Sequence, residues 1–217
     1  MRELEQPIDF VMRHTRLERA PLVPEIELRL GNMVIPLWEL VESEFEEQGM
    51  APPYWAFAWP GGQALARYIL DWPHIVQGRT VLDFAAGSGI AGIAAARAGA
   101  LAVLCADTDP LAETACRING RLNEVAIDTT TDNLVGAMLV PDVILAGDIC
   151  YERALSSQVI GWLGALAARG ATVLIGDPGR TYLPKSGLAR IINYAVSTSR
   201  DLEDQEMRQT DVYQLVA

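Results

Sequence analysis

From residue 80 onward, short apolar runs alternate with longer segments of helical periodicity, and this alternation limits the possible folds most strongly. Strands connected through helices run parallel, because such crossovers are right-handed and place helices against both faces of the sheet. The sequence therefore predicts an α/β fold. The predicted strands are 80–84, 102–106, 125–129, 142–146 and 171–176, and the predicted helices are 90–98, 110–123, 153–168 and 187–197.

The C-terminal end departs from this alternation. Residues 203–209 and 211–216 both have the pattern of extended strands, and only a short turn separates them. Two strands joined in this way run antiparallel. We therefore expect a mostly parallel sheet with one antiparallel strand at its end.

The N-terminal end is expected to form a separate extension. Residues 8–17 have the pattern of a short helix, and residues 25–38 alternate apolar and polar around Gly31 and Asn32, which predicts a β-hairpin. Prolines follow the acidic segment that ends near residue 48, and they cannot continue a helix. We therefore predict an extension over residues 1–50, packed on a main domain of residues 51–217.

Composition limits the partners and the compartment. The net charge of −11 is unfavourable for binding nucleic acid, which needs clustered Lys and Arg. Residues 90–106 are apolar but are interrupted by Arg97 and Gly99, so no membrane span is expected. The three cysteines lack metal-type spacing, and with no recognisable leader they indicate reduced thiols in a cytoplasmic protein. Two histidines are too few for a His-based metal site, and the oligomeric state stays undetermined.

A glycine-rich turn follows the first strand of the alternating region. Gly87, Gly89 and Gly92 form a G-x-G-x-x-G pattern between a strand and a helix, which lets a ligand approach the backbone closely. Asp107 comes twenty residues after Gly87, at the end of the next strand, where its carboxylate can accept hydrogen bonds from ribose hydroxyls. This pattern predicts a nucleoside-containing cofactor.

Asp83 separates two classes of cofactor. A dinucleotide-binding dehydrogenase usually has a small or apolar residue at this strand end. S-adenosylmethionine has no pyrophosphate, and its ammonium and sulfonium suit a neighbouring carboxylate. Asp83 is also expected to accept hydrogen bonds from backbone amides of the turn.

Three further segments carry a family resemblance. The spacing from Asp83 to Gly89 resembles the first motif of class I methyltransferases, and Asp148 to Tyr151 resembles a D-x-x-Y signature of protein lysine methyltransferases. Residues 53–66 are similar to a tryptophan-containing segment of the same proteins, and residues 176–184 are similar to their turn after the fifth strand. Together these motifs resemble the bacterial members of the electron transfer flavoprotein β-subunit lysine methyltransferases.

The resemblance implies a seven-stranded Rossmann-like sheet, S-adenosylmethionine as the methyl donor, and methylation of lysine on a folded protein. It implies roles for eight residues: Asp83, Gly87 and Gly89 around the methionine part, Asp107 on the ribose, Asp132 on the adenine amino group, Trp59 against the cofactor, and Asp148 and Tyr151 at the reacting amine.

Structural roles remain open for three of these residues. Trp59 also fits plain core packing, Asp132 fits a turn, and Asp148 stands where it could cap the helix over 153–168. Three other functions also remain open at this point. They are methylation of another protein or a small amine, a nicotinamide-dependent oxidoreductase, and a binding module without catalysis.

Overall fold

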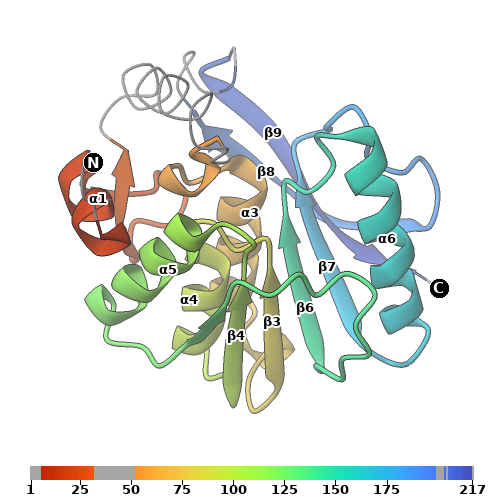
Figure 1. The fold of residues 1–217 in the computed structure, drawn as a ribbon. Helices are drawn as coiled ribbons and strands as arrows, with labels where there is room; N and C mark the ends of the chain where they lie inside the picture. Colours follow the sequence, from red (N-terminus) through yellow and green to blue (C-terminus); the bar gives the residue numbers. More distant parts are fainter. Residues whose placement is uncertain (1–5, 32–51, 199–202, 204, 217) are drawn as a thin grey trace.

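The computed structural model describes residues 6–31, 52–198, 203 and 205–216. Their centre is a seven-stranded sheet in the order β5-β4-β3-β6-β7-β9-β8, with helices on both faces (Figure 1). Pairs from β5 to β7 are parallel, whereas β9 is antiparallel to both of its neighbours. The predicted fold class is confirmed. The strands are β3 (Thr80–Phe84), β4 (Ala102–Ala106), β5 (Asp128–Thr130), β6 (Val143–Gly147), β7 (Thr172–Asp177), β8 (Leu188–Ser197) and β9 (Met207–Leu215).

The helices divide between the two faces of the sheet. Helix α6 (Arg153–Ala167) covers one face, and α3, α4 and α5 cover the other. In β6, Val143 and Leu145 belong to the core under α3 and α4, whereas Ile144 and Ala146 belong to the core under α6. Consecutive side chains of a strand point to opposite faces, so this apolar run is buried on both sides. The other helical bounds are α3 (Pro60–Asp71), α4 (Ile90–Arg97), α5 (Pro110–Leu122), and the short 3-10 turns η1 (Tyr54–Ala56) and η2 (Pro73–Ile75).

The N-terminal elements lie beside α5 (Figure 1). Helix α1 (Pro7–His14) ends three residues before its predicted end, because Thr15 already has extended backbone and begins β1 (Thr15–Arg19). Strand β2 (Glu27–Gly31) pairs antiparallel with β1. The described half of the predicted hairpin therefore pairs with the segment before it, and residues 32–38 lie outside the described part.

The prediction of a helix over 187–197 is wrong, because this segment is strand β8. Its partner in an antiparallel hairpin is β9, which is one continuous strand where two strands were predicted. The register between β8 and β9 shifts between Arg190 and Ile192. Such a bulge breaks the period of two, so the apolar residues on either side appear at a helix-like spacing.

None of the described helices is both long and apolar enough to cross a membrane.

Candidate functional site

The glycine turn has the backbone that a close-approach loop requires. Between β3 and α4, Ala85, Gly87 and Gly89 have φ of 55°, 51° and 79°. A side chain at Gly89 would place its Cβ 2.5 Å from Sγ of Cys116 in α5. This position therefore needs glycine both for its left-handed backbone and for the contact with α5.

Asp83 fixes the start of α4 from inside the core. Its Oδ2 accepts a hydrogen bond of 2.7 Å from the backbone N–H of Gly92, as expected from the sequence. Burial raises the pKa of Asp83 to about 7, and the Gly92 N–H opposes this rise. A cation near this carboxyl would favour its ionised form.

Asp107 holds the glycine turn from the end of the neighbouring strand. Its Oδ2 accepts a 2.9 Å hydrogen bond from Gly87 N–H, and its Oδ1 accepts a 3.1 Å bond from Asp109 N–H. Burial raises the pKa of Asp107. The carboxylate thus stands at the carboxyl ends of parallel strands, where ligands bind in open α/β sheets.

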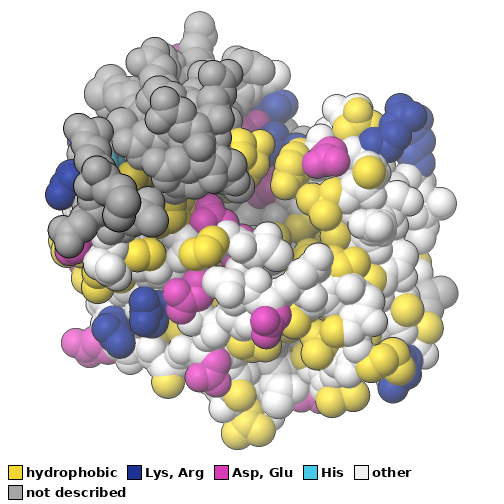
Figure 2. Space-filling model, in the orientation of Figure 1, with side chains coloured by type: hydrophobic (Ala, Val, Ile, Leu, Met, Phe, Trp, Pro, Cys, Tyr) yellow, Lys and Arg dark blue, Asp and Glu magenta, His cyan; other side chains and the backbone are white. Residues whose placement is uncertain are grey.

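A pocket at the glycine turn brings four predicted residues together, namely Trp59, Asp83, Gly87 and Asp148. No Lys or Arg occurs among the described residues that line it. In Figure 2, acidic and hydrophobic side chains are scattered among the white atoms across the middle of the visible face, and Lys and Arg lie toward its edges. The complete lining is Phe57, Trp59, Gly62, Asp83, Ala85, Ala86, Gly87, Ser88, Ile90, Ala91, Gly147 and Asp148.

Asp148 connects this pocket to the start of α3. It follows β6 with φ of 53°, and its backbone N–H donates to the carbonyl of Gly176 at 2.8 Å. Its Oδ2 accepts hydrogen bonds from the N–H groups of Gly61 (2.6 Å) and Gly62 (3.2 Å). The capping role is therefore real but belongs to α3, whereas the N-cap of α6 is Glu152.

Glycines permit this close approach of α3 to the sheet. A Cβ at Gly61 would lie 2.1 Å from the carbonyl oxygen of Gly176, and a Cβ at Gly147 would lie 2.8 Å from the nitrogen of Gly62. Real Cβ atoms are excluded at such distances. The backbones of α3, β6 and β7 therefore meet directly beneath Asp148.

Arg180 is the main residue of the site that sequence reasoning missed. Its Nη2 donates to Oδ1 of Asp148 at 2.8 Å, and it also pairs with Glu203. The sequence indicates the turn after β7 only through its resemblance to the family segment over residues 176–184. The signal in the sequence is an arginine three residues after the aspartate at the end of β7, and this signal does not identify Asp148 as the partner.

Aromatic rings lie beside this ion pair. Trp59 packs edge-on against Tyr54, and Tyr54 also contacts Tyr151, with ring centroids 5.9 and 5.4 Å apart. The indole N–H of Trp59 donates to the carbonyl of Tyr54 at 2.7 Å, and the Arg180 guanidinium lies 5.5 Å from the Trp59 ring centre. Tyr151 remains 48% exposed, so its ring is available at the surface.

Asp132 does not line the pocket. It follows β5 and is exposed, with Thr130 Oγ1 donating to its Oδ2 at 2.9 Å. This arrangement matches the turn role that the sequence left open. Its contact with an adenine amino group stays a prediction.

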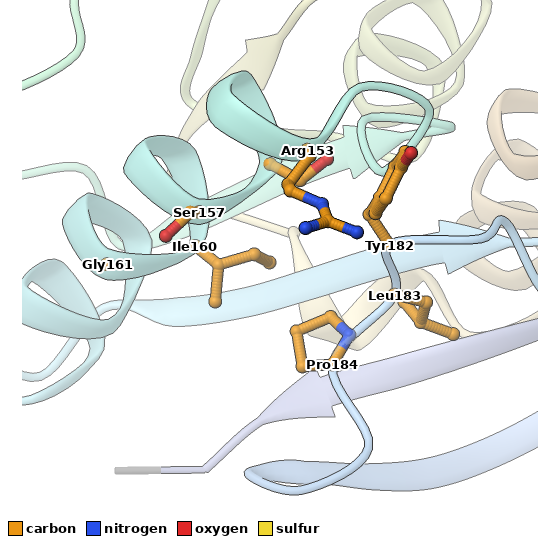
Figure 3. A pocket seen from close by; sticks show the side chains of 8 residues that line it. Arg153, Ser157, Ile160, Gly161, Tyr182, Leu183 and Pro184 are labelled. Atoms are coloured by element: carbon orange, nitrogen blue, oxygen red, sulfur yellow. The ribbon is translucent and has the colours of Figure 1, made fainter.

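A second hollow lies between α6 and the segment after β7 (Figure 3). Figure 3 shows the Arg153 side chain reaching toward Tyr182, and its guanidinium lies 5.6 Å from the ring centre. This hollow contains none of the predicted site residues. Its lining is Arg153, Ser156, Ser157, Ile160, Gly161, Tyr182, Leu183 and Pro184.

Within the described ranges, no group of three or more His, Cys, Asp or Glu residues is arranged to hold a metal ion.

Comparison with solved structures supports the fold. The crystal structure of magnesium protoporphyrin IX methyltransferase from Synechocystis with bound SAH is similar at a TM-score of 0.53. The similarity covers 72% of this chain and 81% of that chain, at 15% sequence identity. At this identity the likeness concerns the fold alone.

Sequence comparison gives the family. Residues 64–150 match the family model of ribosomal protein L11 methyltransferase (PrmA). The electron transfer flavoprotein beta subunit lysine methyltransferase of Xenopus laevis is 38% identical over 214 residues, covering 95% of this chain and 86% of that protein. The Danio rerio protein of the same name is 40% identical over 190 residues, covering 85% and 72%. Identity at this level over most of both chains shows that this protein belongs to the electron transfer flavoprotein β-subunit lysine methyltransferase family.

Proposed function

We propose that this protein transfers methyl groups from S-adenosylmethionine to lysine side chains of the electron transfer flavoprotein β subunit. The observation that carries the proposal is the pocket that joins the glycine turn to Asp148. This pocket places a glycine turn that can bind a nucleoside beside the carboxylate of Asp148 at the rim of the sheet. Family membership supports the choice of lysine and of this partner.

The residues around the glycine turn fit S-adenosylmethionine. The loop offers backbone without a bulky side chain at Gly87, and Asp107 stands at the next strand end to receive ribose hydroxyls. Asp83 and Asp148 line the pocket, and its described lining has no basic residue. A cationic ligand suits this lining, whereas a dinucleotide would bring a pyrophosphate into an acidic pocket. The pocket therefore disfavours a nicotinamide cofactor.

When bound, the cofactor supplies a methyl group whose bond to sulfur breaks as the lysine nitrogen forms its new bond to carbon. The protein chiefly has to orient and desolvate the amine. The amine must also be neutral, and with a reference pKa of about 10.4 only about one lysine in a few thousand is neutral at pH 7.

Asp148 is suited to orient this amine and is not built as a strong base. Two backbone N–H groups and Arg180 already donate to its carboxylate. A carboxylate has about four acceptor positions, so one position remains for an N–H of the substrate. Tyr151 would form an aromatic wall along the lysine side chain, since its exposed ring stands three residues after Asp148.

The test is methyl transfer from radiolabelled S-adenosylmethionine to recombinant electron transfer flavoprotein and, separately, to a bacterial lysate that lacks this enzyme. The expected result is a labelled β subunit, with lysine as the modified residue by mass spectrometry. Label only in other proteins would retain the chemistry and reject this partner. Label only in small molecules would select a small-amine methyltransferase, and no label at all would select a binding module.

We also propose a cytoplasmic location and a boundary near residue 50 between the N-terminal extension and the main domain. The three cysteines are free and buried, which supports a reducing compartment. Cell fractionation with an antibody to the chain tests the location. Limited proteolysis tests the boundary, because a domain boundary near residue 50 predicts a first cut close to that residue.

A further inference from the structure

Arg180 lies between two buried carboxylates at the rim of the sheet. Its Nη2 donates to Asp148 Oδ1 at 2.8 Å, and its Nη1 donates to Glu203 Oε2 at 3.1 Å. The side chains of Asp148, Arg180 and Glu203 are 10%, 18% and 1% exposed. Ion pairs shielded from water in this way are screened far less by salt than surface pairs.

Several contacts fix the guanidinium in this place. Asp177 Oδ1 accepts hydrogen bonds from the backbone N–H groups of Gly179 (2.7 Å) and Arg180 (2.6 Å), which shapes the turn after β7. Glu203 is itself held by Arg208 Nε at 3.0 Å. Arg180 is therefore held from its backbone and from its side chain.

The same contacts determine what Asp148 can do. The N–H groups of Gly61 and Gly62 occupy Oδ2, and Arg180 occupies one position of Oδ1. We infer that Arg180 is a positioning residue for methyl transfer, because its guanidinium favours the charged form of Asp148 and turns this carboxylate so that its last acceptor position receives the lysine amine. This inference rests on the proposed function.

The charges around Asp148 give the inference a pH signature. Burial raises the pKa of Asp148 to about 7, Arg180 lowers this pKa, and Asp177 and Glu203 raise it. The buried thiol of Cys150 also interacts with Asp148. Without Arg180, Asp148 would take up a proton at a higher pH and lose its charged acceptor.

The experiment compares Arg180→Gln and Arg180→Lys with Arg190→Gln as the matched control. Arg190 also forms an ion pair of 2.7 Å, with Asp211, but it is 59% exposed and its described ion pair does not involve Asp148. We expect Arg180→Gln to reduce kcat near pH 7 by about 10- to 100-fold, the loss associated with one charge-assisted hydrogen bond. Binding of S-adenosylmethionine should change by less than about threefold in the same variant.

The decisive readout is the pH profile of kcat. For Arg180→Gln, the deficit relative to the wild type should shrink as the pH rises toward about 9, because Asp148 ionises again. Arg180→Lys should retain most of the activity at neutral pH, and Arg190→Gln should have the wild-type profile. A deficit that is constant with pH, or an unchanged kcat, would overturn the inference.

A double variant separates this inference from the proposed function. If Arg180 acts through Asp148, adding Arg180→Gln to Asp148→Asn should not reduce kcat further. An additional loss of the same size as in the single variant would contradict that route. A wild-type enzyme that labels no protein would instead defeat the proposed function. Circular dichroism and calorimetric binding of S-adenosylmethionine check that each variant is folded.

Discussion

Asp148 and Gly61 are 87 residues apart in the chain, yet Oδ2 of Asp148 accepts a 2.6 Å hydrogen bond from the backbone N–H of Gly61. This bond ties the proposed amine-orienting carboxylate to the first turn of α3. The positive end of the helix dipole favours the ionised carboxylate at this place. The side chain of Asp148 therefore caps α3 and, in the proposed function, also orients the amine.

Asp148→Asn should separate these two roles, because the amide oxygen can still accept from Gly61. We expect kcat to fall by about 100-fold or more, while cofactor affinity remains close to that of the wild type. Methyl-transfer kinetics and isothermal titration calorimetry provide the two measurements. Full turnover by this variant would remove Asp148 from the mechanism.

Asp107→Ala and Asp132→Ala test the cofactor contacts. Asp107 holds the glycine turn and stands at the ribose position, so its loss should raise the Kd for S-adenosylmethionine by about 10- to 100-fold. Asp132 is exposed and its side chain accepts from Thr130 in its own turn, so its loss should cost about tenfold at most. Equal effects from the two variants would contradict this assignment of roles.

Tyr151→Phe and Tyr151→Ala test the aromatic wall. Because the ring is the functional part in this proposal, Phe should retain the KM for the protein substrate and Ala should raise it by about tenfold. Steady-state kinetics with the flavoprotein supply the values. An equally large loss in Tyr151→Phe would assign the role to the hydroxyl group.

Gly61→Ala should destabilise the fold, because its Cβ would lie 2.1 Å from the carbonyl oxygen of Gly176. We expect the free energy of unfolding to fall by about 3 kcal/mol. Gly164 in α6 is the matched control, since nothing lies within 4 Å of its Cβ position. Gly164→Ala should be neutral or stabilise by about 0.5 to 1 kcal/mol. Urea unfolding of both variants gives the comparison.

Asp83→Asn should change how stability depends on pH. Burial raises the pKa of Asp83 to about 7, so this group stabilises the folded state at low pH and loses that contribution as the pH rises through about 7. Relative to the wild type, Asp83→Asn should therefore gain about 2 to 3 kcal/mol of unfolding free energy between pH 5 and pH 8. Urea unfolding at both pH values provides the check, and a difference that does not vary with pH would contradict the buried, neutral form.

The sequence predicted the parallel core well because both of its signals are local. Strands β3, β4 and β6 are apolar runs followed by a helical period, and the spacing of its glycines identifies the glycine turn. Strand β5 is polar and short, and it begins three residues after the predicted start at residue 125. The pattern failed at β8, where a bulge shifts the register at Ile192 and pairing with β9 decides the conformation. The residues of a single segment do not show that a strand later in the chain will pair with it.

Site residues could likewise be predicted from the sequence where their signal is local. Asp83, Gly87 and Asp148 were recognisable because each stands at a strand end, where parallel sheets bind ligands. Arg180 and Glu203 were not, since their role depends on a contact between side chains 23 residues apart. The alternative role of Asp148 as a helix cap was likewise considered for the nearest helix, over 153–168, whereas its partner Gly61 lies 87 residues earlier.

The two halves of the site also differ in how far along the chain their contacts reach. The bonds that shape the cofactor loop join residues 9 and 20 positions apart, from Asp83 to Gly92 and from Asp107 to Gly87. The bond that builds the amine side, between Gly61 and Asp148, spans 87 positions. Short loops close at a lower entropic cost, so the bonds within the cofactor loop are expected to form earlier in folding than the bond between Gly61 and Asp148. The glycine turn is thus expected to take shape first, and the donor pocket is complete only once Gly147 and Asp148 join it.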